Sequence, residues 1–279
     1  MERFILACAQ MASRPMAVGE NIERALELVA RAAVDHRAQL VVLPETVTTG
    51  FSPDCDKREL WSRVEPLPGA LCERIGRAAR QLRVHLAYPT YERGAEEGVV
   101  YNSVALFGAT GELLAVYRKT HLFPTERDTH GGWATAGASP VVVQTPLGGI
   151  GLTLCYDGDF PELYRCEALA GAEVILRPSA FLRSVEIWKL TNAARAFDNQ
   201  VFVAACNAVG SDARGNHYYG HSMIVSPAAE ILAVGQCDEE IVSTEVSPPA
   251  LPATDHLRDR NLPAYRGLLR SPARPGASR

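Results

Sequence analysis

Three polar residues of this 279-residue chain lie where apolar runs end, and their types could do chemistry together. Glu45 ends LVVLPE, Lys119 ends LLAVYRK and Cys155 ends GIGLTLC. In layered α/β structures, the carboxyl ends of strands form the crevice in which ligands bind. A thiol with its ordinary pKa of about 8.5 is mostly protonated at neutral pH, so it needs a neighbouring base or cation to act as a nucleophile. The three residues together predict a nucleophilic cysteine with a carboxylate base and an ammonium beside it.

Each of these residues also has a simpler interpretation. A glutamate or lysine at a strand end is usually a solvated charge, and a free cysteine often behaves as a small buried hydrophobe. Taken together, the three residue types favour a catalytic role, because a lysine would stabilise the oxyanion formed when a thiolate adds to a carbonyl. Removing one such donor typically lowers the rate on the order of a hundredfold or more.

The elements that must position these residues follow from periodicity and turn signals. Two hairpins are predicted, one joining 102–108 to 113–119 through ATGE and one joining 141–145 to 149–155 through PLGG. Helical spacing of apolar residues predicts helices over 21–33, 71–82, 161–170 and 184–200, the first of them capped by Asn21. Further strand-like runs lie at 4–11, 40–45, 84–90, 173–178, 201–208, 221–227 and 240–247. These elements predict a layered α+β sandwich with a mixed sheet.

One internal echo indicates two similar halves. RAQLVVLPET (37–46) and GAEVILRPSA (171–180) each contain a helix end, an apolar strand and then a proline. No low-complexity tract or linker divides the chain, and 47% hydrophobic residues are ample for one large core.

Charge and cysteine content exclude several classes of protein. A formal net charge of −4 gives no long-range attraction to nucleic acid or anionic membranes, so neither is an expected partner. The N-terminal MERFILACAQM has too short an apolar stretch for a signal peptide, and a cytoplasmic protein is expected. The seven cysteines are an odd number without a CxxC pair, which is typical of reduced thiols rather than of a disulfide or metal framework.

The motifs taken in series resemble the nitrilase superfamily of carbon–nitrogen hydrolases. LVVLPE, YRKTHLF and GLTLCYDGDFPE occur in the family's order, and NAARAFDN, GHSMIVSP and DRNLPAY match later motifs. The resemblance implies an α+β fold, a four-layer-forming α-β-β-α sandwich with mixed sheets, that forms a homodimer or higher homo-oligomer. It also implies a single carbon–nitrogen hydrolase domain over residues 1–250. Residues 251–279 would then be a C-terminal extension that contacts the dimer partner and frays at SPARPGASR.

The resemblance assigns roles to individual residues. It implies that Glu45 is the general base, Lys119 an oxyanion donor and Cys155 the nucleophile. Glu126, seven residues after Lys119, matches a second glutamate that positions the base and the substrate. The backbone N–H of Tyr156 is expected to be the second oxyanion donor.

The implied reaction is hydrolysis of the C–N bond of a small carboxamide to the carboxylic acid and ammonia, through a cysteine thioester. No metal and no organic cofactor are expected. CYDGDFPE is most similar to the amidase branch of the family. Two other activities on the same scaffold stay open, an N-carbamoyl amine (ureide) amidohydrolase and a nitrilase. A catalytically inactive binding protein of the same fold is the alternative from another class.

Several other residues are weighed at the pocket and in its loops. Phe51, Trp133 and Trp188 are candidate pocket-lining residues, although aromatic side chains in such positions are equally often plain packing. Asp157 is expected to cap a turn or helix rather than to act in catalysis.

Histidine and arginine residues near the motifs are expected to be structural. His217 and His221 have the i, i+4 spacing of zinc ligands on a helix, but the Tyr-Tyr-Gly between them favours a strand or turn, which argues against zinc. His121 is expected to shape the loop after Lys119, and Arg195 to form an ion pair or a dimer contact.

Overall fold

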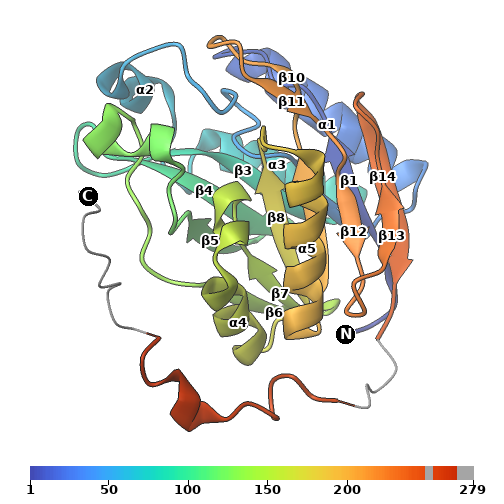
Figure 1. Ribbon diagram of the computed structural model, residues 1–279. Coiled ribbons are helices and arrows are strands. Elements are labelled where there is room, and N and C mark those ends of the chain that lie inside the picture. The colour runs from blue at the N-terminus through green and yellow to red at the C-terminus, as the bar shows by residue number, and fades with distance from the viewer. Residues whose placement is uncertain (249–253, 269–279) are drawn as a thin grey trace.

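Two mixed sheets stack face to face in the computed structural model, which describes residues 1–248 and 254–268 (Figure 1). The first sheet has the order β14-β1-β2-β3-β4-β5, with β1 (Phe4–Gln10), β2 (Leu40–Val42), β3 (His85–Arg93), β4 (Val100–Phe107), β5 (Leu113–Arg118) and β14 (Glu240–Val246). The second has the order β13-β12-β9-β8-β7-β6, with β6 (Val142–Thr145), β7 (Gly148–Leu152), β8 (Val174–Ser179), β9 (Phe202–Asn207), β12 (Met223–Val225) and β13 (Ile231–Val234).

Helices cover the outer face of each sheet. They are α1 (Val18–Val34) and α3 (Ala70–Leu82) on the first sheet, and α4 (Pro161–Leu169) and α5 (Val185–Asn199) on the second. Helix α2 (Lys57–Arg63) lies outside these layers and packs through Leu60 in a separate cluster with Tyr91 and Val100. One apolar cluster fills the space between the sheets, a second joins α1 and α3 to the first sheet, and a third joins α4 and α5 to the second. In Figure 1, α4 and α5 lie in front and α1 lies on the far side. The predicted α-β-β-α sandwich with mixed sheets is therefore confirmed.

The two halves of the internal echo form equivalent strands of the two sheets, β2 and β8. β2 lies between β1 and β3, and β8 lies between β7 and β9, and in both cases all three strands are parallel. Parallel strands buried on both faces read as continuous apolar runs, which is the pattern that LVV and VIL show. The two echo segments, 37–46 and 171–180, therefore end just past the carboxyl ends of equivalent central strands, β2 and β8.

Some local predictions were wrong. Helix α1 begins at Val18 with Ala17 as its N-cap residue, so Asn21 lies inside the first turns instead of capping them. The Asn21 side chain is buried and bonds outside the helix, donating to the backbone oxygens of Arg14 and Thr48 at 2.8 Å each. The Asn21 side chain, which suggested a cap, therefore bonds to segments outside the helix instead of to the helix N-terminus. Periodicity also missed α2, β13 and the hairpin of β10 (Val209–Ser211) and β11 (His217–Tyr219).

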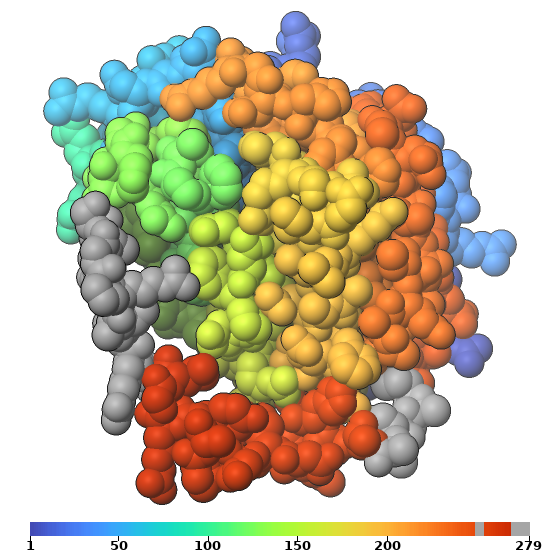
Figure 2. Space-filling view, viewed as in Figure 1, coloured from blue at the N-terminus to red at the C-terminus, as the bar shows by residue number. Residues whose placement is uncertain are grey.

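The described part of the C-terminal segment packs along the helical layer. Gln200 at the end of α5 accepts a hydrogen bond from His256 N–H at 2.8 Å, and Arg165 of α4 donates to the His256 oxygen at 3.3 Å. Figure 2 shows this segment (red) along the edge of the face that α5 (yellow) dominates. The division at residue 250 stays a prediction, and SPARPGASR lies outside the described residues. No helix within 1–248 and 254–268 combines the length and apolarity needed to cross a bilayer.

Glu167 of α4 is a buried carboxyl that faces β7. A Cβ placed on Gly151 would lie 2.4 Å from Glu167 Oε2, so the glycine makes room for the carboxyl. Within the described part of the chain, neither carboxyl oxygen has a hydrogen-bond partner. Burial raises the pKa of Glu167 well above its ordinary value, and the negative charge of Asp157 raises it further. The neutral acid is therefore the form that the fold prefers.

We expect Glu167→Gln to flatten part of the pH dependence of stability. A carboxyl whose folded pKa is raised contributes stability that is fully present below the unfolded pKa of about 4.3 and is lost as pH rises towards the folded pKa, by up to about 1.4 kcal/mol per pH unit. The variant side chain is neutral at every pH. Its free energy of unfolding, measured by urea titration, should therefore rise relative to that of wild type between pH 5 and pH 8. The exposed Glu162→Gln on the same helix is the control. Parallel curves for Glu167→Gln and wild type would contradict the assignment.

Candidate active site

The two echo segments meet where their strands end. Glu45 follows β2 and Ala180 follows β8. The Glu45 N–H donates to the Ser179 oxygen at 3.4 Å, and the Ala180 N–H donates to Glu45 Oε2 at 2.9 Å. The first predicted site residue is thus held at the contact between the two halves of the fold, with 2% of its surface exposed.

Lys119 is completely buried at the end of β5 and lies between two carboxylates. Its Nζ donates to Glu45 Oε1 at 2.7 Å and to Glu126 Oε2 at 2.6 Å. Burial acts to lower the pKa of Lys119, but the negative charges of Glu126 and Glu45 outweigh it and hold that pKa above its usual value. Burial in turn raises the pKa of Glu126 against the opposing effect of Lys119. The lysine is therefore a fixed cation.

Asn102 of β4 completes this cluster, and the sequence analysis missed it. Its Nδ2 donates to Glu45 Oε1 and to Glu126 Oε1, both at 2.8 Å. Its backbone oxygen accepts the Lys119 N–H at 2.8 Å. The available signal was an amide inside the apolar strand VYNSVALF, where a buried polar side chain requires partners.

Cys155 is the first residue of the short 3₁₀ helix Cys155–Asp159, which follows β7, and it has a φ of 43°. That left-handed conformation is uncommon for a residue other than glycine and is found at functional turns. Burial raises the pKa of the Cys155 thiol, and the negative charge of Glu45 raises it further, while Lys119 and Arg177 lower it. Glu45 and Lys119 thus both act on the sulfur, and the resting side chain is a protonated thiol.

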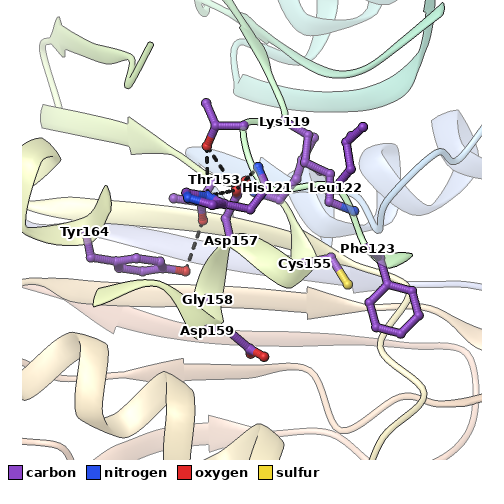
Figure 3. Close-up of polar contacts among 12 residues, drawn as sticks. Lys119, His121, Leu122, Phe123, Thr153, Cys155, Asp157, Gly158, Asp159 and Tyr164 are labelled. Carbon is purple, nitrogen blue, oxygen red and sulfur yellow. Dashed lines mark hydrogen bonds and ion pairs between the residues drawn. The ribbon is translucent and has the colours of Figure 1, made fainter. Parts of the chain in front are cut away.

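Asp157 ties the cysteine turn to the loop that follows Lys119. Its Oδ2 accepts hydrogen bonds from the Leu154 N–H at 2.9 Å and the Tyr117 hydroxyl at 2.7 Å. Its Oδ1 accepts the His121 N–H at 3.0 Å, and the His121 ring stacks on Phe160 with 3.8 Å between centroids. Figure 3 shows the polar contacts that converge on Asp157 beside Cys155. The predicted capping role of Asp157 is confirmed, and His121 shapes the loop as expected.

Two arginines hold the same turn from behind. Arg177 of β8, fully buried, donates from Nε to the Cys155 oxygen at 2.9 Å. Gly158 is required there, because a Cβ on it would lie 1.9 Å from Arg177 Cζ. Arg195 of α5 donates from Nε to the Gly158 oxygen at 3.0 Å, and its Nη1 lies 3.6 Å from Asp198, which is a structural ion-pair role. The sequence analysis did not single out Arg177.

A narrow pocket of about 270 Å³, including the part open to solvent, leads to the sulfur. Figure 3 shows Cys155 and Phe123 at this place, with the sulfur directed towards the phenyl ring. The lining residues are mainly apolar or aromatic, namely Phe51, Phe123, Cys155, Tyr156, Ala180, Phe181, Leu182 and Arg183.

The candidate pocket residues differ in their distance from this space. Phe51 lines the pocket, whereas Trp133 and Trp188 form a layer behind it. Trp133 packs edge-on against Phe51 with 6.2 Å between centroids, and Trp188 packs against Phe181 at 4.9 Å. Both tryptophans are buried, at 2% and 0% exposure, because their large rings fill core space. They support the pocket wall and do not face the cavity.

The two histidines with zinc-like spacing lie on the hairpin and just after it. The Nδ1 of His217 faces Ser211 Oγ at 3.2 Å, and that of His221 faces the Tyr219 oxygen at 2.9 Å. Across the described residues, no group of three or more His, Cys, Asp or Glu side chains is placed to hold a metal ion.

We expect Asp157→Asn to lower the free energy of unfolding by about 1–3 kcal/mol, because the amide replaces an acceptor oxygen with a donor that faces other donors. Asp128→Asn is the matched control, since it breaks only an exposed pair with Lys57 and should change stability by less than about 1 kcal/mol. Urea denaturation followed by circular dichroism measures both values. Equal values for the two variants would show that Asp157 does not tie the loops together.

Comparison with known proteins gives a consistent set of relatives. The chain is 31% identical over 253 residues to the omega-amidase NIT2 of Xenopus tropicalis, covering 88% of this chain and 89% of that protein. It is 31% identical over 260 residues to the deaminated glutathione amidase of Synechocystis sp., with 90% and 94% covered.

Solved structures agree with these sequence relatives. An alanine mutant of the amidase from Nesterenkonia sp. AN1 in complex with butyramide superposes with a TM-score of 0.82 at 25% identity, covering 96% of this chain and 97% of that chain. Nit3 of Saccharomyces cerevisiae, a member of branch 10 of the nitrilase superfamily, gives a TM-score of 0.77 at 28% identity, with 88% and 91% covered. The model of the carbon–nitrogen hydrolase family matches residues 5–254. The chain therefore belongs to the carbon–nitrogen hydrolase family, which is the nitrilase superfamily.

Proposed function

We propose that this protein is an amidase that hydrolyses a small carboxamide to the carboxylic acid and ammonia through a thioester on Cys155. One observation carries the proposal. Cys155 lines a narrow, mostly apolar pocket, and the pKa of its thiol responds to the charges of Glu45 and Lys119, which form a buried ion-pair cluster with Glu126. The amidase names of the relatives support the same reaction.

Acylation begins at the sulfur. Because burial disfavours a resting thiolate, the thiol proton must leave as the sulfur attacks the amide carbonyl carbon, and Glu45 is the base that accepts it. The carbonyl oxygen becomes an oxyanion, which the Lys119 ammonium and the Tyr156 backbone N–H stabilise. Glu45 then returns the proton to the departing nitrogen, so ammonia leaves and a thioester remains on Cys155.

Deacylation uses the same groups in the same order. Glu45 takes a proton from a water molecule, the water oxygen adds to the thioester carbonyl carbon, and the same donors stabilise the second oxyanion. The C–S bond breaks, the sulfur regains its proton and the carboxylic acid is released. The net change is amide plus water to acid plus ammonia, with no cofactor consumed.

Glu126 and Asn102 hold Glu45 and Lys119 in fixed positions. Lys119 donates to both glutamates, and Asn102 donates to both as well, so each glutamate is fixed by the same pair of donors. Glu126 Oε2 also accepts the Phe123 N–H at 2.9 Å, which fixes a wall of the pocket relative to the cluster. Glu126 is therefore a positioning residue for the base, the ammonium and the substrate.

A homodimer or higher homo-oligomer remains part of the proposal. Helix α5, which lies on the face seen in Figure 2, exposes Ile187, Leu190 and Phe197 by 39%, 67% and 49%. Exposed apolar side chains gathered on one helix are typical of surfaces that pack against another subunit.

We expect Cys155→Ala to abolish hydrolysis because it removes the nucleophile. Ammonia release from simple amides should fall to the uncatalysed background, while the circular dichroism spectrum stays that of the wild type. Cys72→Ala, which truncates a buried cysteine in α3, should retain turnover. Intact-protein mass spectrometry should detect an acyl adduct in the wild type alone. Continued ammonia release by Cys155→Ala would rule out the mechanism, and carbon dioxide released with ammonia from N-carbamoyl substrates would favour the ureide activity.

We expect Glu126→Gln to lower kcat by about a hundredfold with a smaller change in KM, because misplaced catalytic groups affect the transition state more than substrate binding. Glu92→Gln provides the comparison, since it disrupts another buried carboxylate, bonded to Arg118 Nε at 2.9 Å, outside the pocket. That variant should lose stability and keep most of its turnover. A Glu126→Gln rate within about twofold of wild type would reduce Glu126 to a structural charge.

A further inference from the structure

The pocket wall contains a single charged side chain, Arg183, among its eight lining residues. The remainder of the wall consists of four aromatic rings with Cys155, Ala180 and Leu182. A free guanidinium in this place would be a ready partner for a carboxylate, because its planar fork matches two carboxylate oxygens. Whether Arg183 is free therefore decides which amides the pocket accepts.

Arg183 is already paired. Its Nη2 donates to Asp159 Oδ1 at 2.7 Å, and the arginine and aspartate side chains are only 31% and 22% exposed. The same Asp159 oxygen lies 4.0 Å from Nη2 of Arg177, the buried arginine that holds the cysteine turn. Asp159 thus lies between two guanidinium groups, and its negative charge compensates the positive charge of Arg183 at the pocket wall.

The aromatic wall fixes Arg183 in this paired position. Its Cζ lies 4.7 Å from the ring centroid of Phe181 and 5.8 Å from that of Tyr156. Contacts of a cation with ring faces favour this placement and restrict the rotamers available to the arginine. A substrate carboxylate at Arg183 would meet the negative charge of Asp159 in a partly buried place, and bringing two carboxylates to one guanidinium there is unfavourable.

We propose that Asp159 is a specificity-determining residue: by occupying Arg183, it restricts the pocket to uncharged amides with short apolar acyl chains and excludes amides whose chain ends in a carboxylate. The inference rests on the proposed amidase function and names the substrate class of that site. The mostly apolar wall of this small pocket matches an apolar chain better than a charged one. Removal of the Asp159 charge then leaves a cation at the wall that a carboxylate-bearing amide can use.

The test compares butyramide with succinamate, which have the same chain length and differ in a terminal methyl or carboxylate. The measured quantity is the ratio of kcat/KM for the two amides, from ammonia release, because a general loss of activity cancels in a ratio. Wild type should favour butyramide by at least about tenfold. Asp159→Asn should shift the ratio towards succinamate by about tenfold, and this gain should weaken as NaCl is raised.

Two further variants isolate the arginine. The double variant Asp159→Asn/Arg183→Met should lose the gain and return to within about threefold of the wild-type ratio, because no cation is left to bind the carboxylate. Arg183→Met alone should also leave the ratio within about threefold of wild type, since a paired arginine contributes nothing to succinamate binding. This single variant decides the question if Asp159→Asn fails to fold by circular dichroism.

The outcomes separate this inference from the proposed function. Wild type that cleaves both amides equally well, an unchanged ratio in folded Asp159→Asn, or a gain that persists in the double variant overturns the role of Asp159. A fall in succinamate cleavage relative to butyramide in Arg183→Met does so too, because it makes the native arginine a carboxylate ligand. Absence of ammonia from any amide, with folded wild-type protein, overturns the amidase proposal and the present inference with it.

Discussion

The ammonium of Lys119, held without solvent between Glu45 and Glu126, is the interaction on which the site depends. Removing an ion of this size from water costs several kcal/mol, so it persists only where partners surround it closely. Here Glu45 follows β2, Glu126 ends the short 3₁₀ helix Pro124–Glu126, and Asn102 of β4 bonds to both carboxylates. Any change in how these elements pack would leave a buried charge unpaired. The cluster proposed to perform the chemistry is for this reason also a constraint on the fold.

Burial sets the mechanism as well as the structure. The burial that strengthens the ion pairs also raises the pKa of the Cys155 thiol, so the thiol rests with its proton. In the reaction proposed above, a base must accept this proton during attack, and Glu45, fixed beside the lysine, is the group proposed for that role. Cys155 has a positive φ, and hydrogen bonds of its turn with the Asp157 carboxylate and the Arg177 guanidinium hold this conformation. Strain at the nucleophile is thus balanced by hydrogen bonds from two separate elements.

The pocket shows how the same scaffold can separate catalysis from selectivity. The candidate catalytic residues lie where strands end and depend on contacts between the two sheets, whereas the outer wall is built from Phe123, Phe181 and their neighbours in loops. Loops accept substitution more readily than buried strand ends do. An ion pair such as Arg183 with Asp159 can therefore alter the charge that a substrate meets without disturbing the lysine and its glutamates.

The sequence by itself determined most strands and most helices, and it placed Glu45, Lys119 and Cys155 where strands end. It could do so because apolar periodicity, turn residues and motif order are local properties of the chain. The meeting of the β2 and β8 ends, the shared donor Asn102 and the grip of Arg177 on the cysteine turn were decided only by the tertiary structure. The same is true of Trp133 and Trp188, which became supports behind the wall rather than its surface. Local sequence sets which way a side chain leaves its own backbone, but its partners lie on segments distant in sequence that the packing of the two sheets brings together.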